Sequence, residues 1–422
     1  MHFYIILEKR QGKKMLKYEI KKVFAKTSCR IAVWLMAALL AVICWFACGV
    51  SYVNSEGISE SGYQAVRKLR LERKAWAGYL DEETLQLVIE KNAEIAASPE
   101  ANSKEVNQNN IAYARKQGFR DIRDLLNYSY SDGFREYNYY KADSLTSEDA
   151  GAFYKNRIRL LAEWLEEDGK EQFGEKEKEY LIRQYEELET PMYYDYSEGW
   201  RQLFEYSPSV IMIFVLILGF LVAGIFGNEF TWKADSVFYS SKHGRDRAVR
   251  AKLRAGLWIT TVFYWAVMLI YTGIVLALLG ADGANCPIQA HFSGWKSFYN
   301  ITVWQEYLLI AAGGYIGSLF FALLTMLISA RTRSTVLAVI VPFVLVFLPS
   351  FLSNIQSAWV NKVLGLLPDR LLQISAQLKY FDVYAVGNTV MGAVPLLLIL
   401  YGVVSVLLYP IIYRVYAKIQ VS

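Results

Sequence analysis

The residues with the greatest potential for chemistry lie in a charged segment, 228–254, between two long apolar stretches. This segment carries seven Lys/Arg residues, three acidic residues and one of the three histidines of the chain. Arg247, Arg250 and Arg254 are spaced as on a helix, which predicts a short helix that continues into the next apolar stretch. Two interpretations are open: basic residues that fix the orientation of a membrane protein, or a rigid surface for a soluble partner.

The rest of the sequence offers no recognisable catalytic or metal-binding pattern. The four cysteines, Cys29, Cys44, Cys48 and Cys286, form no CxxC motif, and residues 54–205 contain no histidine. Neither a Gly-x-Ser-x-Gly motif nor a phosphate-binding G-x-x-x-x-G-K-[ST] motif occurs. We therefore expect no catalytic, cofactor-binding or metal-binding residue in this chain.

Charge divides the chain into two parts of opposite sign. Residues 54–205 contain 31 acidic and 21 basic residues, whereas the remainder contains 9 acidic and 24 basic residues. The basic residues of the remainder flank apolar stretches, which is typical of membrane proteins and does not indicate nucleic-acid binding. The lipid bilayer is therefore the expected partner of this part.

Crossing a bilayer takes about 20 apolar residues. Six stretches approach or exceed that length, and their central parts contain no Asp, Glu, Lys, Arg or His. Carriers driven by protons or ions usually need such groups near the middle of the membrane, so an energy source outside this chain is expected. The six predicted spans are Ile31–Val53, Val210–Gly227, Leu257–Leu279, Tyr307–Ser329, Thr335–Leu352 and Val394–Tyr413.

Basic residues near the span ends predict the orientation. Residues 1–30 carry nine Lys/Arg, and the segment 228–254, the short loop after the fourth span and the C-terminal tail are also basic. With six spans, all four segments lie on one side, so both termini are predicted to be cytoplasmic. Residues 54–205 and the loop 353–393 are then extracellular.

The two polar parts near the N-terminus are both predicted to be helical. In residues 1–30, Leu16, Ile20 and Val23 share one face, which is typical of an amphipathic helix on the inner leaflet. Residues 54–205 have few Gly and Pro residues, and Asp81 is a probable N-cap of a helix that follows it. The predicted fold class is therefore an all-α membrane protein with six transmembrane helices in 31–53 and 206–422 and a large helical extracellular domain between spans one and two.

Short motifs in several places carry a resemblance to a known family. An acidic residue at the end of the second span is followed by a stretch that ends S-x-x-x-G-R…A-K-L, here Glu229, Ser240, Gly244–Arg245 and Ala251–Leu253. This pattern resembles the permease subunits of type-2 ATP-binding-cassette exporters. The start MLKYEIKKVF and the sequence TPMYYDYSEGWRQLFEYSP are similar to Gram-positive members with a large loop after the first span. One departure is FTWKAD, where family members often have Gly.

The resemblance implies a role for the charged segment. In the family, the corresponding segment contacts a cytoplasmic ATPase, and two six-span subunits form the pathway. Carried over by position, the expected ATPase-coupling residues are Glu229, Ser240, Lys242, His243, Gly244, Arg245, Arg247, Arg250 and Lys252.

The same resemblance implies the partners and the location. It implies a cytoplasmic ATP-binding-cassette ATPase that holds ATP and magnesium, and a second permease subunit in a homodimer or heterodimer. It also implies the cell membrane of a bacterium of the Gram-positive type, and outer helices that re-enter the membrane within 353–393.

The expected function is that of a permease subunit that exports a peptide, a lipid or a hydrophobic drug and has no enzymatic activity of its own. The alternative is a membrane sensor or scaffold that does not transport and whose extracellular domain binds a ligand. A transporter should show ligand-dependent ATP hydrolysis with its partner, whereas a scaffold should bind without turnover.

Overall fold

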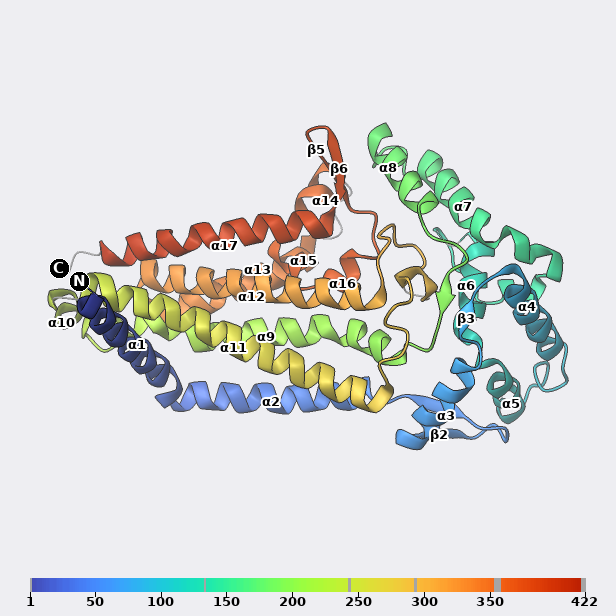
Figure 1. Ribbon diagram of the computed structural model, residues 1–422, viewed down its shortest axis with the longest axis horizontal. Coiled ribbons are helices and arrows are strands. Elements are labelled where there is room, and N and C mark those ends of the chain that lie inside the picture. The colour runs from blue at the N-terminus through green and yellow to red at the C-terminus, as the bar shows by residue number, and fades with distance from the viewer. Residues whose placement is uncertain (1, 133, 242–243, 292–293, 353–357, 419–422) are drawn as a thin grey trace.

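The computed structural model describes residues 2–132, 134–241, 244–291, 294–352 and 358–418. The molecule is elongated, with a bundle of long helices at one end and a smaller helical domain at the other (Figure 1). Helix α1 and the end of α17 lie at the end of the bundle that is remote from this domain. We call that end the basic end, and residues 54–197 the inserted domain.

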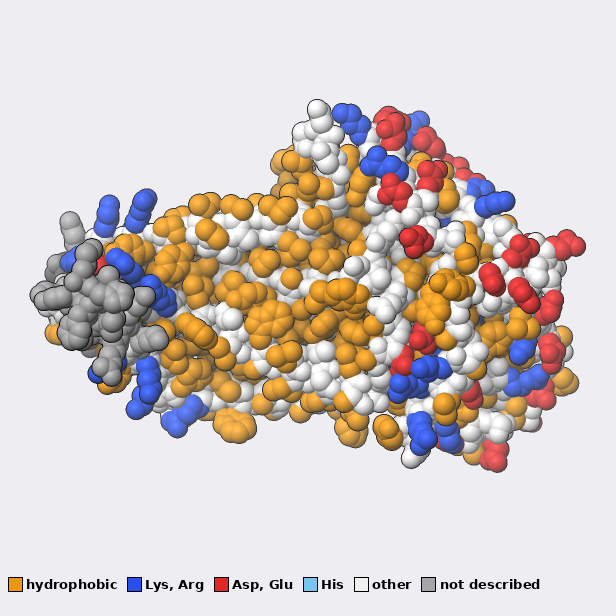
Figure 2. Space-filling model, in the orientation of Figure 1, with side chains coloured by type: hydrophobic (Ala, Val, Ile, Leu, Met, Phe, Trp, Pro, Cys, Tyr) orange, Lys and Arg blue, Asp and Glu red, His pale blue; other side chains and the backbone are white. Residues whose placement is uncertain are grey.

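Five helices of the described chain are long and apolar enough to cross a membrane. They are α2 (Thr27–Ala47), α9 (Glu198–Thr231), α11 (Val249–Leu279, continuous with the turn from Gly244), α12 (Val303–Thr332) and α17 (Ala393–Ala417). Their apolar side chains form a broad hydrophobic band around the bundle, with charged side chains gathered at its two ends (Figure 2). These features identify the chain as a multi-pass membrane protein.

The sixth predicted span is a shorter helix. Helix α13 (Thr335–Leu352) is apolar throughout and contains Pro342 and Pro349. It lies on the outside of the bundle and packs one side against α9 and α12. Pro342 and Pro349 are buried on that side, where neighbouring helices can cover the carbonyl groups that the prolines leave without partners.

Two helix ends differ from the predicted boundaries. The first helix ends at Ala47, and Ser51–Val53 forms strand β1, which pairs with β2 (Ser59–Ser61). Helix α9 begins at Glu198 rather than near Val210, because the acidic side chain of Glu198 is neutralised by arginines and can lie in a buried helix. The inserted domain therefore ends at Ser197, and residues 198–205 belong to a bundle helix.

The inserted domain is helical, as predicted. Its helices are α3 (Tyr63–Lys74), α4 (Glu82–Ala96), α5 (Val106–Lys116), α6 (Arg120–Tyr130), α7 (Phe153–Glu167) and α8 (Glu175–Glu186), with short 3-10 turns at Lys141–Ser144 and Ser147–Ala152. The Asp81 side chain accepts a hydrogen bond from the backbone N–H of Thr84, which confirms the predicted N-cap. The pair β3 (Gly78–Tyr79) and β4 (Tyr193–Tyr194) closes the domain.

The core of the inserted domain is completed by the two loops that join later bundle helices. Trp295, from the loop between α11 and α12, is buried with residues of α4, α6 and α7. Phe298 and Val383 join a second cluster with residues of α7 and α8. The sequence prediction of a domain formed by 54–205 alone is therefore incomplete, and the domain is fixed to the bundle by contacts distant in sequence.

The segment between α13 and α17 forms several short elements at the same end. These are α14 (Ala358–Leu364), α15 (Pro368–Leu371), α16 (Ile374–Gln377) and the hairpin β5 (Val383–Val386) with β6 (Thr389–Gly392). A side chain on Gly313 of α12 would lie 2.4 Å from Ile374, and one on Gly317 would lie 2.6 Å from Leu372. These glycines thus allow the short helices to pack closely against α12. The hairpins show that the chain is mostly, but not entirely, α-helical.

Candidate functional site at the basic end of the bundle

The charged segment forms a compact cap on the basic end. Helix α9 ends at Thr231, and the backbone reverses at Lys233, whose φ is 52°. A short helix, α10 (Asp235–Ser240), and a π-helical turn, Gly244–Ala248, then lead directly into α11. The helix that the arginine spacing predicts is thus present and continues into the bundle. Two predicted site residues, Lys242 and His243, lie outside the described residues.

Gly244 occupies a position that admits no side chain. A β-carbon there would lie 1.8 Å from the carbonyl oxygen of Phe238 and 2.6 Å from Oγ of Ser241. The absence of a side chain lets the turn approach α10 closely. The glycine that the resemblance identified therefore shapes the cap.

Two predicted site residues, Glu229 and Lys252, form a buried ion pair inside the bundle. Nζ of Lys252 lies 2.7 Å from Oε1 of Glu229 and donates a second hydrogen bond of 2.7 Å to the carbonyl oxygen of Ile225. The side chain of Lys252 is 0% exposed and that of Glu229 is 7% exposed. Because α9 carries Glu229 and α11 carries Lys252, the pair fixes the two helices to each other and cannot itself touch a docked protein.

Helix α1 (His2–Ala25) supplies the remaining charges of this cluster. Nζ of Lys22 lies 2.6 Å from the same Oε1 of Glu229, and Oε2 of Glu19 lies 3.2 Å from Nζ of Lys252. Nζ of Lys26, just after α1, donates a hydrogen bond of 2.5 Å to Oδ1 of Asn228. Four charged side chains from α1, α9 and α11 therefore form one network, which we call the ion brace: Glu19, Lys22, Glu229 and Lys252.

An aromatic cluster attaches the cap to the last bundle helix. Tyr416 of α17 is 0% exposed, and its ring centroid lies 4.5 Å from that of Phe226, 5.5 Å from that of Tyr239 and 5.8 Å from that of Phe238. Such contacts stabilise an interface beyond the burial of apolar area. The cluster packs α9, α10 and α17 together.

Polar contacts link the turn and α17. The hydroxyl group of Tyr413 donates a hydrogen bond of 2.8 Å to Oδ1 of Asp246, which also pairs with Arg250 at 2.5 Å. Arg245 donates a hydrogen bond of 3.1 Å to the carbonyl oxygen of Ala417 and lies over the ring of Tyr239. The cap is therefore held by the first and last helices of the chain as well as by α9 and α11.

Several residues of the cap remain exposed. Val237 is 72% exposed and Trp232 is 52% exposed, although both are large and apolar. Ser240, Ser241, Arg245 and Arg250 are also exposed, while Arg247 is half-buried. We define the exposed face of the cap by six residues: Trp232, Val237, Ser240, Ser241, Arg245 and Arg250. Exposed apolar side chains beside arginines are the composition expected of a protein-binding surface.

A second ion network lies at the opposite end of α9. Arg73 of α3 is buried and pairs with Glu198 at 2.8 Å and with Asp121 of α6 at 3.1 Å. Burial alone would raise the pKa of Asp121, but Arg73 and Arg201 together lower it below its usual value. This network joins the inserted domain to α9, 31 residues from Glu229, a separation of about 46 Å along the helix axis.

The sequence predicts the cap but not the ion brace that attaches it to the bundle. The structure brings six of the predicted site residues together at the basic end, but two of them, Glu229 and Lys252, lie in the interior. The six are Glu229, Gly244, Arg245, Arg247, Arg250 and Lys252. Residues 1–30 were predicted to form an amphipathic helix on the inner leaflet, whereas Lys22 of α1 contacts Glu229 of α9.

A search for metal ligands and comparisons with known proteins add no further functional assignment. The described part of the chain contains no group of three His, Cys, Asp or Glu residues that could hold a metal ion. No protein-family model matches the sequence, and no curated protein matches it significantly.

Proposed function

We propose that the chain is the membrane-spanning subunit of an ATP-driven exporter and that a separate cytoplasmic ATPase binds the exposed face of the cap. The observation that carries this proposal is the construction of the cap, which presents Trp232, Val237 and Arg245 to solvent while the ion brace fixes its base. A surface that must receive mechanical work needs both features: groups that bind a partner and a rigid attachment to the helices that move.

The arrangement of the long helices supports this function. A push on the cap acts on α9 and α11 together, because Glu229 and Lys252 join them. Helix α9 then carries the displacement to Glu198, where Arg73 connects it to the inserted domain. ATP binding on the partner would thus rearrange the bundle and the inserted domain in one movement.

The topology in this proposal has six passes, with α13 as the fifth. Helix α1 and the end of α17 lie at the same end of the bundle (Figure 1), which requires an even number of passes. The basic residues at that end favour the cytoplasmic side of a bacterial cell membrane. A second permease subunit, identical or different, would complete the pathway.

A purification experiment tests the proposal. The tagged full chain is isolated from native membranes in mild detergent, and the proteins that accompany it are identified by mass spectrometry. We expect a soluble ATPase with a phosphate-binding loop in stoichiometric amount. Arg245→Glu combined with Arg250→Glu, both on the exposed face of the cap, should reduce its recovery at least tenfold, whereas Lys155→Glu with Arg159→Glu, on the exposed face of the inserted domain, should not. Recovery of the chain without any ATPase contradicts the proposal.

A sensor or scaffold is the second candidate, and a cleft between the inserted domain and the segment around β5 favours it. The cleft has a volume of about 650 Å³ and lies between the α7–α8 connection and the loop around β5. Acidic residues predominate in its charged lining, which includes Glu167, Asp168, Glu171 and Asp382. A cationic peptide would complement this charge. Binding of such a peptide without any ATP hydrolysis by the purified complex would favour the sensor.

A further inference from the structure

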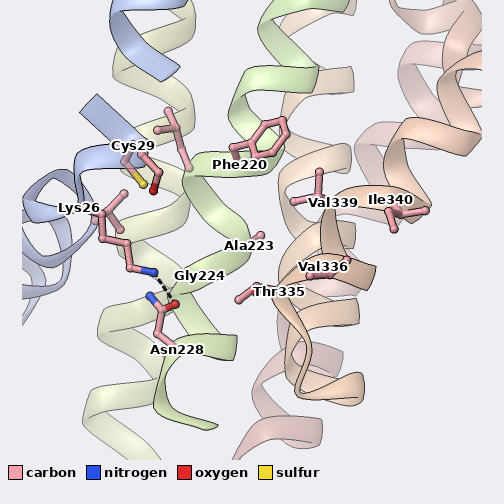
Figure 3. A pocket seen from close by; sticks show the side chains of 13 residues that line it. Lys26, Cys29, Phe220, Ala223, Gly224, Asn228, Thr335, Val336, Val339 and Ile340 are labelled. Atoms are coloured by element: carbon pink, nitrogen blue, oxygen red, sulfur yellow. Dashed lines mark hydrogen bonds between the residues drawn. The ribbon is translucent and has the colours of Figure 1, made fainter. Parts of the chain in front are cut away.

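A cavity of about 440 Å³ opens beside the ion brace, between the α1–α2 junction, α9 and α13. Most of its wall is apolar and includes Phe220, Val339 and Ile340 (Figure 3). Lys26, Asn228 and Thr335 gather toward the other end (Figure 3). The cavity is therefore amphipathic, with a cationic group at one end. Its volume lies in the range of sites that hold small molecules.

The cation at this end has no acidic partner among the described residues. Nζ of Lys26 donates to the neutral amide oxygen of Asn228 and lies 5.3 Å from the ring centroid of Trp232. The nearby carboxylate of Glu229 is already bound by Lys22 and Lys252. Since an ammonium group has three donor hydrogens, Lys26 can donate to an anion without losing its bond to Asn228.

The apolar part of the cavity is continuous with the surface that faces lipid. Phe220 is 60% exposed and Val336 is 64% exposed, and both belong to helices of the apolar band. A soluble anion such as phosphate would bind Lys26 but leave these side chains uncovered. An acyl chain would cover them, because it is as apolar as the wall. The occupant that fits both ends is a lipid with a negatively charged headgroup.

The position of the cavity agrees with this occupant. Basic residues immediately beside transmembrane helices attract anionic lipids, and basic pockets between such helices bind their headgroups. Arg30 is exposed one turn beyond Lys26 and adds a second positive charge. Thr335 supplies a hydroxyl group from α13 on the opposite wall.

We propose that this cavity binds an anionic phospholipid, with the phosphate group at Lys26 and one acyl chain along Phe220, Val336 and Ile340. A bound lipid would bridge α1, α9 and α13 next to the ion brace and would stabilise the end of the bundle that carries the cap. This site is independent of whether an ATPase binds the cap.

Native mass spectrometry of the purified full chain tests the proposal, with phosphatidylglycerol and phosphatidylcholine as probes. The wild-type chain should retain phosphatidylglycerol at least tenfold better than phosphatidylcholine. Lys26→Gln should lower this preference about tenfold, and Lys26→Arg should preserve it because the charge is kept. The matched control is Lys21→Gln, which removes an exposed lysine from α1, the helix that ends just before Lys26, and should leave the preference unchanged.

A second variant separates loss of the lipid from loss of the fold. Ile340→Trp keeps Lys26 and its bond to Asn228 but fills the apolar wall, so it should lower phosphatidylglycerol retention while the ion brace stays intact. Equal retention in wild type, Lys26→Gln and Ile340→Trp would overturn the proposal. Displacement of the lipid by millimolar inorganic phosphate alone would also overturn it, because the site would then recognise only a soluble anion.

Discussion

Replacement of Lys252 by Met tests whether the ion brace fixes the cap to the bundle. The ammonium group of Lys252 is 0% exposed and contacts Glu229 at 2.7 Å, the carbonyl oxygen of Ile225 at 2.7 Å and Glu19 at 3.2 Å. Loss of one member of a buried ion pair usually costs about 3–5 kcal/mol. Glu229 keeps Lys22 as a partner at 2.6 Å, so we expect Lys252→Met to cost about 3 kcal/mol, at the low end of this range.

Removal of the acidic partner should lower the free energy of unfolding further. Glu229→Gln leaves the fully buried Lys252 with only one carboxylate, that of Glu19, and we expect a loss of about 4 kcal/mol. Because the two residues contact each other, the double variant should cost less than the sum of the single variants, with a coupling free energy of about 1–3 kcal/mol.

The assay is thermal unfolding of the full chain in lipid nanodiscs, followed by intrinsic tryptophan fluorescence. A loss of about 3 kcal/mol should lower the Tm by roughly 5 °C or more. Lys21→Met is the matched control, since Lys21 is exposed on the same α1 helix, and its effect should stay within about 0.5 kcal/mol. If Lys252→Met unfolds at the same temperature as Lys21→Met, or if the double-variant effects simply add, the ion brace does not exist as described.

Three further predictions concern other parts of the fold. Gly244→Ala should displace the turn, since its β-carbon would lie 1.8 Å from the carbonyl oxygen of Phe238, and we expect faster proteolysis of the cap with little change in the Tm of the inserted domain. Arg157→Lys should destabilise the inserted domain by about 2–3 kcal/mol in thermal unfolding, because Arg157 is buried and donates to the carbonyl oxygens of Trp295 and Ser297; an unchanged Tm would contradict this. Burial lowers the pKa of His291 to about 4 from its usual 6.5, so between these values the unfolded chain binds a proton that the folded chain does not, and stability should fall as the pH drops from 6.5 to 4. His291→Gln should weaken this dependence in Tm measurements at pH 7 and pH 5, and an identical pH profile would refute the assignment.

The parts of the fold that were predictable from sequence rest on local patterns. Apolar stretches of about 20 residues predicted five of the bundle helices. Asp81 predicted the start of α4. The helical spacing of Arg247 and Arg250 predicted a cap that continues into α11. These features depend on neighbours along the chain, and the physical rule for each is short-range.

The parts that were missed depend on contacts distant in sequence. Lys22 and Glu229 are 207 residues apart, and no local pattern pairs them. The polar start of α9 was predicted to belong to the domain 54–205 and not to a bundle helix, because an arginine that neutralises Glu198 lies in α3. Trp295 completes a core formed mainly by a domain that ends almost 100 residues earlier. The composition of residues 1–30 predicts that this segment is basic, but it does not predict which lysine contacts α9.

The most direct test of the proposed function is the rate of ATP hydrolysis by the complex that is purified through the tagged full chain and reconstituted into lipid nanodiscs. We predict a stoichiometric ATPase whose hydrolysis is lost or becomes insensitive to the membrane subunit when Arg245 and Arg250 are both changed to Glu, and is unaffected by Lys155→Glu with Arg159→Glu. A folded chain that yields no ATP hydrolysis and no ATPase from native membranes would contradict the proposal that it is the permease of an ATP-driven exporter.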